Sequence, residues 1–379
     1  MIKGKNVLMI SSVASMIKQF NLDNIRMLQD KGCTISVATN FESGDSMDKQ
    51  QVTDFKQYLK EHNVLYYQVD FSRGIGTINS NLTAYKQLLH ITGETRFSLI
   101  HTHSPLASVL ARLVGKKKHI PVIYTAHGFQ FFTGGRKKDW LLFYPIEKIL
   151  SGFTDDLITI NKEDFNRAKQ KFYAKNVDYI PSVGIDTNKF LNAPINKELK
   201  LKINNKFTVI QVGELSKRKN QEMTIKAISL LKNKNINLLL CGIGNEEKNL
   251  RDLVGRLGLN NQVHFLGYQP HVEEIYRIAD LAIMPSLREG FGLAGIEAMA
   301  SGLPLLASNI NGIRDYTKQG ITGYYYDPLD TFGFSNGIEV LLENDELRKK
   351  MGSNNRLVAQ KFDKKCVNKI MLNIYSRFV

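Results

Sequence analysis

The most informative stretch of the sequence is residues 287–304, LREGFGLAGIEAMASGLP. It follows a short apolar run at 281–286, LAIMPS, which is typical of a buried strand. A turn containing Gly290 and Gly292 comes next, and the spacing from Leu293 onward predicts a helix. Glycines let backbone N–H groups approach an anion, and the N-terminus of a helix adds partial positive charge. The stretch therefore predicts a strand–turn–helix unit that can hold an anionic group.

The same alternation of strand and helix extends over the whole sequence. In the second half, apolar runs predict strands at 207–213, 237–242, 262–267, 281–286 and 304–308. In the first half, they predict strands at 6–13, 33–39, 63–70, 98–103, 121–127, 156–161 and 177–182. This alternation is typical of parallel sheets covered by helices on both faces. Because 379 residues exceed what one hydrophobic core usually serves, we expect an α/β protein of two doubly wound domains, joined near 183–196. We expect ligands at the carboxyl ends of the strands, in the cleft between the domains.

From the sequence we expect neither a membrane span nor an export signal. No stretch approaches the roughly 20 uninterrupted apolar residues of a transmembrane helix. The cysteines, Cys33, Cys241 and Cys366, are far apart and lack the spacing of a metal site. No Asp-x-Asp motif or cluster of His, Cys and carboxylate residues predicts a bound metal. We therefore expect a cytoplasmic protein with reduced thiols and no metal.

Part of the formal net charge of +15 is concentrated between residues 112 and 148. The basic residues of this segment are Arg112, Lys116, Lys117, Lys118, Arg136, Lys137, Lys138 and Lys148. They are interleaved with aromatic and aliphatic residues such as Phe129, Trp140 and Leu141. Clustered cations beside apolar side chains are typical of proteins that bind an anionic membrane surface. A solvated basic loop beside a core helix is the alternative, and no nucleic-acid-binding motif accompanies the charge.

Two carboxylates in the opening stretch, Glu289 and Glu297, are eight residues apart, or about two helical turns. If the helix begins near Glu289, both carboxylates lie on one face of it. Carboxylates accept hydrogen bonds from vicinal hydroxyl groups, so such a pair could hold a transferred sugar and a ribose. The alternative is a glycine turn with two solvated acids.

The same stretch resembles the signature of glycosyltransferase family 4, whose members are retaining enzymes with the GT-B fold. The family's Glu-x7-Glu motif, with Gly-Phe-Gly inside it, is matched by Glu289 and Glu297. The resemblance covers essentially the whole chain, and within the family it is to capsule and exopolysaccharide enzymes of the CapM kind. It implies two Rossmann-like domains that face a central cleft. Residues 1–183 with 364–379 would bind the acceptor, and residues 184–363 would bind the nucleotide sugar.

By this resemblance, the opening stretch would bind the donor. Glu289 would contact the hydroxyls of the transferred sugar as a catalytic residue, and Glu297 would bind the ribose hydroxyls. The sugar and phosphate would be held by the turn and its N–H groups, at Gly290, Phe291, Gly292 and Leu293.

A second segment, VGELSKRKNQ at 212–221, resembles the family's Gly-Arg-Leu-x-x-x-Lys-Gly pattern. Gly213 ends a strand, and Lys219 takes the position of the lysine. By the resemblance, Lys219 would neutralise the diphosphate leaving group, a role that a metal ion fills in other transferases.

This segment departs from the family pattern at two positions. Glu214 replaces the arginine, and Asn220 replaces the final glycine. The second positive charge on the phosphate is then missing. Lys217 or Arg218 could supply it, or both could be solvent-exposed.

The remaining candidates lie at other strand ends. Gly242 belongs to a turn that resembles the family's Gly-x-Gly-Pro, and Tyr268 to the segment that reads the nucleobase. His127, in TAHG, takes the place of a histidine that touches the sugar or acceptor at the reaction centre. His103, in HTHSP, is a further candidate. Ser15 lies where many relatives have a glycine-rich turn close to the diphosphate.

The resemblance implies a metal-independent, retaining glycosyltransferase that needs no cofactor. We expect a UDP-sugar donor, N-acetylated in many capsule enzymes, and a polyprenyl-diphosphate-linked saccharide acceptor. The enzyme would serve capsular or extracellular polysaccharide synthesis at the inner face of the cell membrane. One alternative is a GT-B epimerase or hydrolase of UDP-sugars. Another is a noncatalytic nucleotide-sugar-binding subunit, which the set of Glu289, Glu297 and Lys219 disfavours.

Overall fold

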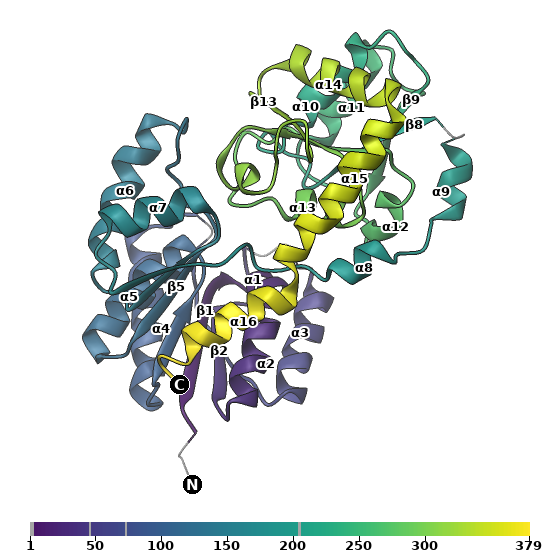
Figure 1. Ribbon diagram of the computed structural model, residues 1–379. Helices are drawn as coiled ribbons and strands as arrows, with labels where there is room; N and C mark the ends of the chain where they lie inside the picture. Colours follow the sequence, from purple (N-terminus) through teal and green to yellow (C-terminus); the bar gives the residue numbers. More distant parts are fainter. Residues whose placement is uncertain (1–3, 45–46, 73, 204–205) are drawn as a thin grey trace. The chain divides into compact units, whose positions relative to one another are not determined.

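The structure is a computed structural model that describes residues 4–44, 47–72, 74–203 and 206–379. The chain divides into two compact units (Figure 1). Unit 1 comprises Met1–Val183 and Val367–Val379, and unit 2 comprises Gly184–Cys366. The C-terminal segment thus rejoins unit 1 at Val367, three residues after the predicted position of 364.

Unit 1 is built on a parallel sheet with the strand order β3-β2-β1-β4-β5-β6-β7. The strands are β1 (Asn6–Val13), β2 (Thr34–Asn40), β3 (Leu65–Gln68), β4 (Leu99–Thr102), β5 (Val122–Ala126), β6 (Asp156–Thr159) and β7 (Asn176–Tyr179). The helices are α1 (Ala14–Phe20), α2 (Leu22–Asp30), α3 (Lys49–Glu61), α4 (Ile78–Glu94), α5 (Pro105–Lys118), α6 (Lys137–Ser151) and α7 (Lys162–Lys171), with α16 (Lys364–Tyr375) at the C-terminus. The strands are short apolar runs because helices cover both faces of the sheet. The run 7–10 in β1, for example, is fully buried.

Unit 2 repeats this architecture with the strand order β10-β9-β8-β11-β12-β13, again in parallel. Its strands are β8 (Phe207–Val212), β9 (Ile236–Cys241), β10 (Val263–Gly267), β11 (Leu281–Met284), β12 (Leu305–Ser308) and β13 (Gly323–Tyr326). Its helices are α8 (Thr187–Leu191), α9 (Lys197–Lys202), α10 (Gln221–Leu230), α11 (Glu247–Arg256), α12 (Val272–Tyr276), α13 (Leu293–Ala300), α14 (Thr331–Glu343) and α15 (Asp345–Ala359), with 3₁₀ turns η1 (Asn311–Asp315) and η2 (Gln360–Phe362). The core of unit 2 packs strand residues such as Leu238 and Leu240 against Ile228 of α10 and Ile338 of α14.

In each sheet, the strand order reverses between two neighbouring strands. The reversal lies between β1 and β4 in unit 1 and between β8 and β11 in unit 2. Doubly wound sheets bind ligands at the carboxyl ends of the strands at such a reversal, because the following chain segments leave towards opposite faces. The loops after β8 and β11 carry Lys219 and Glu289, and the segments after β4 and β5 carry His103 and His127.

Candidate active site

Two loops meet at the strand reversal of unit 2, where a backbone N–H and the side-chain amide of Asn220 donate to carbonyl groups across the contact. The N–H of Leu287 donates to the carbonyl of Arg218 at 2.8 Å. The amide of Asn220 donates to the carbonyl of Pro285 at 3.0 Å. Asn220 has a left-handed backbone with φ of +57°, which asparagine adopts more readily than most residues. Asparagine can therefore stand where the family pattern has glycine.

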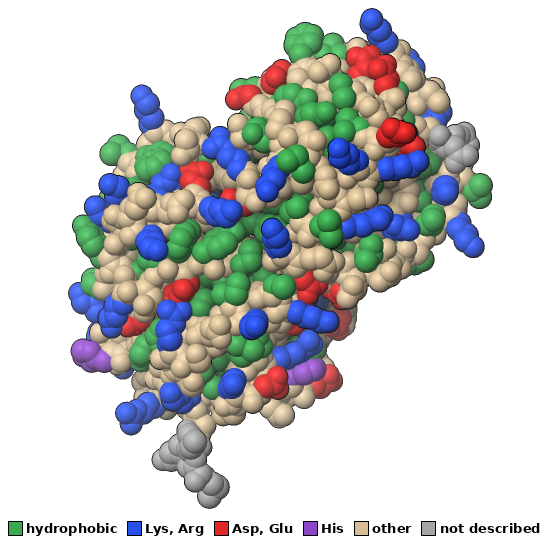
Figure 2. Space-filling model, viewed as in Figure 1, with side chains coloured by type: hydrophobic (Ala, Val, Ile, Leu, Met, Phe, Trp, Pro, Cys, Tyr) green, Lys and Arg blue, Asp and Glu red, His purple; other side chains and the backbone are tan. Residues whose placement is uncertain are grey.

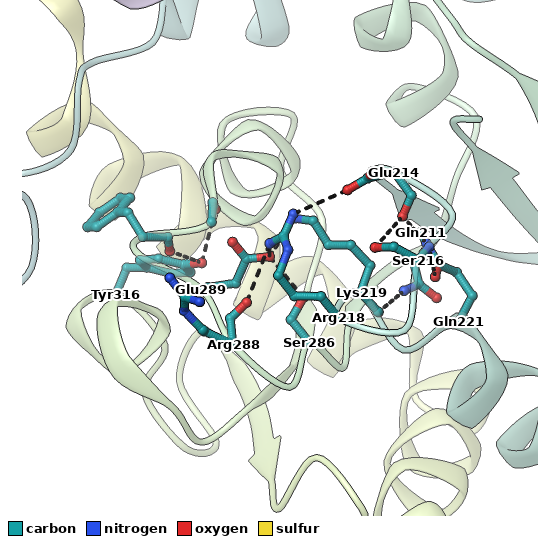
Figure 3. Close-up of polar contacts among 12 residues, drawn as sticks. Gln211, Glu214, Ser216, Arg218, Lys219, Gln221, Ser286, Arg288, Glu289 and Tyr316 are labelled. Atoms are coloured by element: carbon teal, nitrogen blue, oxygen red, sulfur yellow. Dashed lines mark hydrogen bonds and ion pairs between the residues drawn. The ribbon is translucent and has the colours of Figure 1, made fainter. Parts of the chain in front are cut away.

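The side chains of these two loops converge on one carboxylate oxygen (Figure 3). Oε1 of Glu289 accepts from Lys219 Nζ at 2.5 Å, from Ser286 Oγ at 3.0 Å and from Arg218 Nη1 at 3.3 Å. The side chain of Glu289 is 8% exposed and that of Lys219 is 13% exposed. Burial removes water from the pair, so the two charges need each other as partners. The structure thus brings Lys219 and Glu289 together.

The structure also separates the two candidates for a second positive charge. Arg218 reaches Glu289 and lies 3.7 Å from the carboxylate of Glu214 (Figure 3). Lys217 instead lines a depression of about 590 Å³ between the start of α10 and α11, with Glu222 and Glu246 on its walls. Arg218 is therefore the cation that accompanies Lys219.

The opening stretch forms the predicted strand, turn and helix, but Glu289 lies outside the helix. Helix α13 begins at Leu293, because Gly292 caps it with a left-handed φ of +86°. The helix begins where the sequence predicted, so the condition under which Glu289 and Glu297 would share one helix face, a helix that begins near Glu289, is not met. Glu289 instead lies in the turn before α13, and Arg218 and Lys219 of the loop after β8 bind its carboxylate.

The turn before α13 is oriented by Tyr316. The Tyr316 hydroxyl lies 3.1 Å from the carbonyl oxygens of both Phe291 and Gly292 and donates its proton to them. In a trans peptide, the C=O and the following N–H point in opposite directions. The N–H groups of Gly292 and Leu293 therefore point away from Tyr316, as a backbone anion site requires.

Glu297, on α13, lies beside Tyr276. The Tyr276 hydroxyl is 3.5 Å from Oε2 of Glu297 and 3.1 Å from the carbonyl of Ala294. Burial raises the pKa of Glu297 to about 7, although the positive charges of Lys189 and Lys219 and the Tyr276 hydroxyl act to lower it. The carboxyl group of Glu297 therefore changes its charge near neutral pH.

Three glycines at neighbouring strand ends bring the backbone close together. Gly213 donates to Cys241, and Gly242 donates to Gly267 at 2.7 Å. A Cβ on Gly242 would lie 2.1 Å from the carbonyl oxygen of Gly213, so only glycine fits there. Tyr268, which follows β10, is 71% exposed. Ile243, between Gly242 and Gly244, is 60% exposed.

The candidates in unit 1 lie near its own strand reversal. His103 is buried after β4, and its Nδ1 is 3.3 Å from Nε2 of His127, which follows β5. Burial lowers the pKa of His127 to about 4. Ser15 is buried in the first turn of α1, which follows β1 without an intervening loop.

The basic and aromatic segment at residues 112–148 is only partly exposed at the surface. Arg112 is fully buried and pairs with Glu147 at 2.9 Å, so neither charge belongs to the surface. The aromatic residues Phe129, Phe131 and Phe132 are also buried. The exposed apolar residues of α6 are Leu141, Leu142, Ile146 and Ile149.

Sequence and structure comparisons identify the class of this protein. The profile described as "Glycosyltransferase Family 4" matches residues 19–189, and that described as "Glycosyl transferases group 1" matches residues 194–358. The chain is 34% identical to EpsD of Bacillus subtilis (strain 168) over 312 residues, which are 79% of this chain and 81% of EpsD. The protein is therefore a glycosyltransferase. It belongs to glycosyltransferase family 4, as the sequence motifs predicted.

Other relatives and solved structures agree with this assignment. The chain is 27% identical, over 79% of its length and 80% of the relative's, to the UDP-Gal:alpha-D-GlcNAc-diphosphoundecaprenol alpha-1,3-galactosyltransferase of Escherichia coli. It is 25% identical to the capsular polysaccharide biosynthesis glycosyltransferase CapM of Staphylococcus aureus, over 88% and 91% of the two chains. The crystal structure of Anabaena Alr3699/HepE in complex with UDP-glucose matches with a TM-score of 0.79 and 21% identity over 98% and 99% of the chains. The predicted GT-B fold is thereby confirmed.

The described residues lack two features, a membrane-spanning helix and a cluster of metal ligands. Within residues 4–44, 47–72, 74–203 and 206–379, no helix is long and apolar enough to cross a membrane. In the same residues, no group of three or more His, Cys, Asp or Glu side chains is placed to hold a metal ion. Catalysis without a metal stays a prediction.

Proposed function

We propose that this glycosyltransferase transfers a sugar from a UDP-sugar, with retention, to a lipid-linked saccharide used in capsular or extracellular polysaccharide synthesis. The observation that carries the proposal is the convergence of Lys219, Arg218 and Glu289 at the strand reversal of unit 2. The HepE complex with UDP-glucose and the name of the Escherichia coli relative support a UDP-sugar donor. That relative's diphosphoundecaprenol acceptor, together with CapM, supports the lipid-linked acceptor and its pathway class.

In the proposed mechanism, the residues at the strand reversal of unit 2 bind the diphosphate and the sugar of the donor. The diphosphate would lie against Lys219 and Arg218 and against the N–H groups at the start of α13, which stabilise the charge that develops on the leaving phosphate. Lys219 would then move from Glu289 towards the phosphate, leaving the carboxylate to accept hydroxyl groups of the sugar. The leaving phosphate would help to deprotonate the acceptor hydroxyl on the same face, so no enzymic nucleophile is needed. His127 would touch the sugar or the acceptor.

The direct test is product analysis with a panel of UDP-sugars, N-acetylated sugars first, and a polyprenyl-diphosphate-linked saccharide. We expect one donor to give a glycosylated lipid whose new bond keeps the anomeric configuration of the donor, as measured by NMR. A control without acceptor should show little turnover. Free sugar or a C2 or C4 epimer in that control would instead identify a hydrolase or epimerase, and donor binding without turnover would identify a noncatalytic subunit.

Activity is expected to survive an excess of chelator. Lys219 and Arg218 would supply positive charge to the diphosphate, which is the task of a metal in other transferases. The measurement is the initial rate of transfer after dialysis against EDTA. Complete loss of the rate, with recovery on adding Mg²⁺ or Mn²⁺, would contradict the metal-free mechanism.

A membrane-binding surface is proposed on α6, with Lys137, Lys138, Leu142, Ile146 and Ile149, joined by the lysines at the end of α5. Leu142, Ile146 and Ile149 recur at the spacing of one helix face. Figure 2 shows hydrophobic and cationic side chains next to each other over the α6 end of unit 1. The buried Arg112–Glu147 pair fixes α6 to α5.

The protein is expected to sediment with anionic but not with neutral liposomes. Each engaged cation contributes about 1 kcal/mol, enough for reversible attachment, and salt should weaken it because charges are screened within about 8 Å. Changing residues 116–118 and 136–138 to serine should abolish sedimentation, and Leu142→Ser with Ile146→Ser should weaken it at every salt concentration. Both variants should keep the wild-type affinity for UDP. If wild-type protein does not sediment with anionic liposomes at low salt, the exposed face of α6 is only a solvated surface.

The affinity for UDP is expected to fall by about tenfold between pH 8 and pH 6. The sign follows from Glu297, whose pKa is raised to about 7, because only its ionised form accepts two ribose hydroxyls. Below pH 7 the carboxyl group is mostly protonated, so it must lose its proton before UDP binds, and this lowers the observed affinity. The measurement is titration calorimetry, compared with Glu297→Gln so that the protonation of UDP itself cancels. An identical pH dependence in both proteins would exclude Glu297 as the titrating group.

A further inference from the structure

Three histidines gather at the carboxyl edge of the unit 1 sheet, on two adjacent strands. His101 lies in β4, His103 follows β4, and His127 follows β5. The ring centroids of His101 and His103 are 4.1 Å apart, and those of His103 and His127 are 5.5 Å apart. His101 and His103 are fully buried, whereas His127 is partly exposed. The cluster therefore leads from the interior of the sheet to the residue that is expected to reach the substrate.

The inner histidine is held at both ring nitrogens. Nδ1 of His101 is 2.7 Å from the Tyr375 hydroxyl at the end of α16, and Nε2 is 2.8 Å from Oγ1 of Thr125. The backbone N–H of His103 donates to the carbonyl of Ile10 in β1 at 2.9 Å. His103 is thus clamped between β1 and the ring of His101. Its side chain has little freedom to move relative to His127.

The outer two histidines share a hydrogen bond that depends on where their protons lie. Nδ1 of His103 is 3.3 Å from Nε2 of His127. Burial lowers the pKa of both imidazoles, to about 4 for His127, so both are neutral at pH 7. A neutral imidazole carries one N–H, on one of its two nitrogens. Either His103 donates from Nδ1, or His127 donates from Nε2.

The second nitrogen of His103 decides between these arrangements. Nε2 of His103 is buried and has no hydrogen-bond partner among the described residues. If His103 accepted at Nδ1, its proton would be on Nε2, as a buried N–H without an acceptor. If His103 donates from Nδ1, only a lone pair is left at Nε2. Orphaned buried N–H groups are the rarer and more costly of the two.

We propose that His103 is a positioning residue for the transfer reaction: it donates from Nδ1 to Nε2 of His127 and so holds His127 as the Nδ1–H tautomer. The one polar atom that His127 then has left is a hydrogen-bond donor. His127 would bind an oxygen of the sugar or acceptor as a neutral donor, and its Nε2 would not be available as a general base. The catalytic part of this inference rests on the proposed function, whereas the tautomer does not.

The tautomer can be measured directly by ¹⁵N NMR of the histidine side chains in the full-length protein. We expect the His127 Nδ1 signal of wild-type protein at pH 7.5 to be that of an N–H nitrogen, and the Nε2 signal to be that of an acceptor. His103→Asn, which keeps an amide donor near the position of Nδ1, should preserve this pattern. His103→Leu should move His127 towards the Nε2–H form. His90→Leu, a change at an exposed histidine of α4, should alter neither the pattern nor the rate.

The same variants are then compared in the transfer assay, with melting temperatures to confirm that they are folded. We expect kcat to fall about tenfold or more in His103→Leu, to recover at least half of that loss in His103→Asn, and the donor KM to stay within about twofold. An Nε2–H tautomer in wild-type His127, or an unchanged kcat in folded His103→Leu, would overturn the inference. Absence of transfer by the wild-type protein would contradict the proposed function instead, and the NMR measurement would still decide the contact.

Discussion

Replacing Lys219 with alanine is expected to lower kcat/KM for the nucleotide sugar by about 10²-fold or more. The Lys219 ammonium lies at the strand reversal of unit 2, where the charge of the leaving diphosphate would develop. A preorganised cation in a site with little water stabilises such charge far more than an exposed one. The affinity for UDP should fall in the same variant, because UDP carries the same phosphates.

The control for charge alone is Lys217→Ala. Lys217 is exposed and lines the depression between the starts of α10 and α11, and its removal should change kcat/KM by less than about twofold, since exposed charges are screened. Arg218→Gln should fall between the two, because the Arg218 side chain is 42% exposed but reaches the same carboxylate. Near-normal kinetics in Lys219→Ala, with a large loss in Arg218→Gln, would show that Arg218 and not Lys219 is the main cation for the leaving diphosphate.

Loss of stability has to be separated from loss of chemistry in Lys219→Ala. The Glu289 side chain is 8% exposed, and without Lys219 its charge would keep Arg218 and Ser286 as partners. A buried charge that loses a partner destabilises the fold. The double variant Lys219→Ala with Glu289→Gln should recover the melting temperature while activity stays low. Recovery of activity together with stability would mean that Lys219 acts only on the fold.

The elements around this site could be predicted from sequence because each is encoded over a few residues. The apolar run before Pro285 and the left-handed Gly292 set where β11 ends and α13 begins. The restart of the pattern at Phe207 likewise predicted the second sheet. Such features depend on local spacing and on glycine, which the sequence displays directly.

Contacts between distant segments could not be predicted in this way. Lys217 and Arg218 are adjacent in sequence, and only the packing of their loop against the β11–α13 turn shows which one reaches Glu289. Arg112 appeared as one of eight surface cations until its pairing with Glu147 showed that it is buried. The bond between His103 and His127 depends on the pairing of β4 with β5. In each case, the deciding partner lies at least 24 residues away in sequence.

Replacing the two glutamates one at a time is expected to separate binding of the nucleotide from turnover of the sugar. Glu297→Gln should weaken the binding of UDP, because a hydrogen bond to a charged group is worth about 1.5–3 kcal/mol, or about 10- to 150-fold in affinity. Glu289→Gln should leave UDP binding unchanged or make it tighter. The neutral amide no longer competes with the diphosphate for Lys219, whose Nζ is 2.5 Å from Glu289 Oε1.

For turnover, the larger effect is expected in Glu289→Gln, the variant with the smaller effect on UDP binding. Glu289→Gln should lower kcat by about 10- to 100-fold, since the bonds to the sugar hydroxyls are lost in the transition state, whereas Glu297→Gln should mainly raise KM. Both variants are nearly isosteric, but Glu289→Gln removes the carboxylate partner of Lys219 and should lower the melting temperature more than Glu297→Gln, so the kinetics are measured well below both melting temperatures. Calorimetry with UDP and steady-state kinetics with the UDP-sugar give the two quantities. Because Glu289 contacts a cation and Glu297 contacts the Tyr276 hydroxyl, equal UDP affinity in both variants would show that the ribose and sugar roles of these two residues are misassigned.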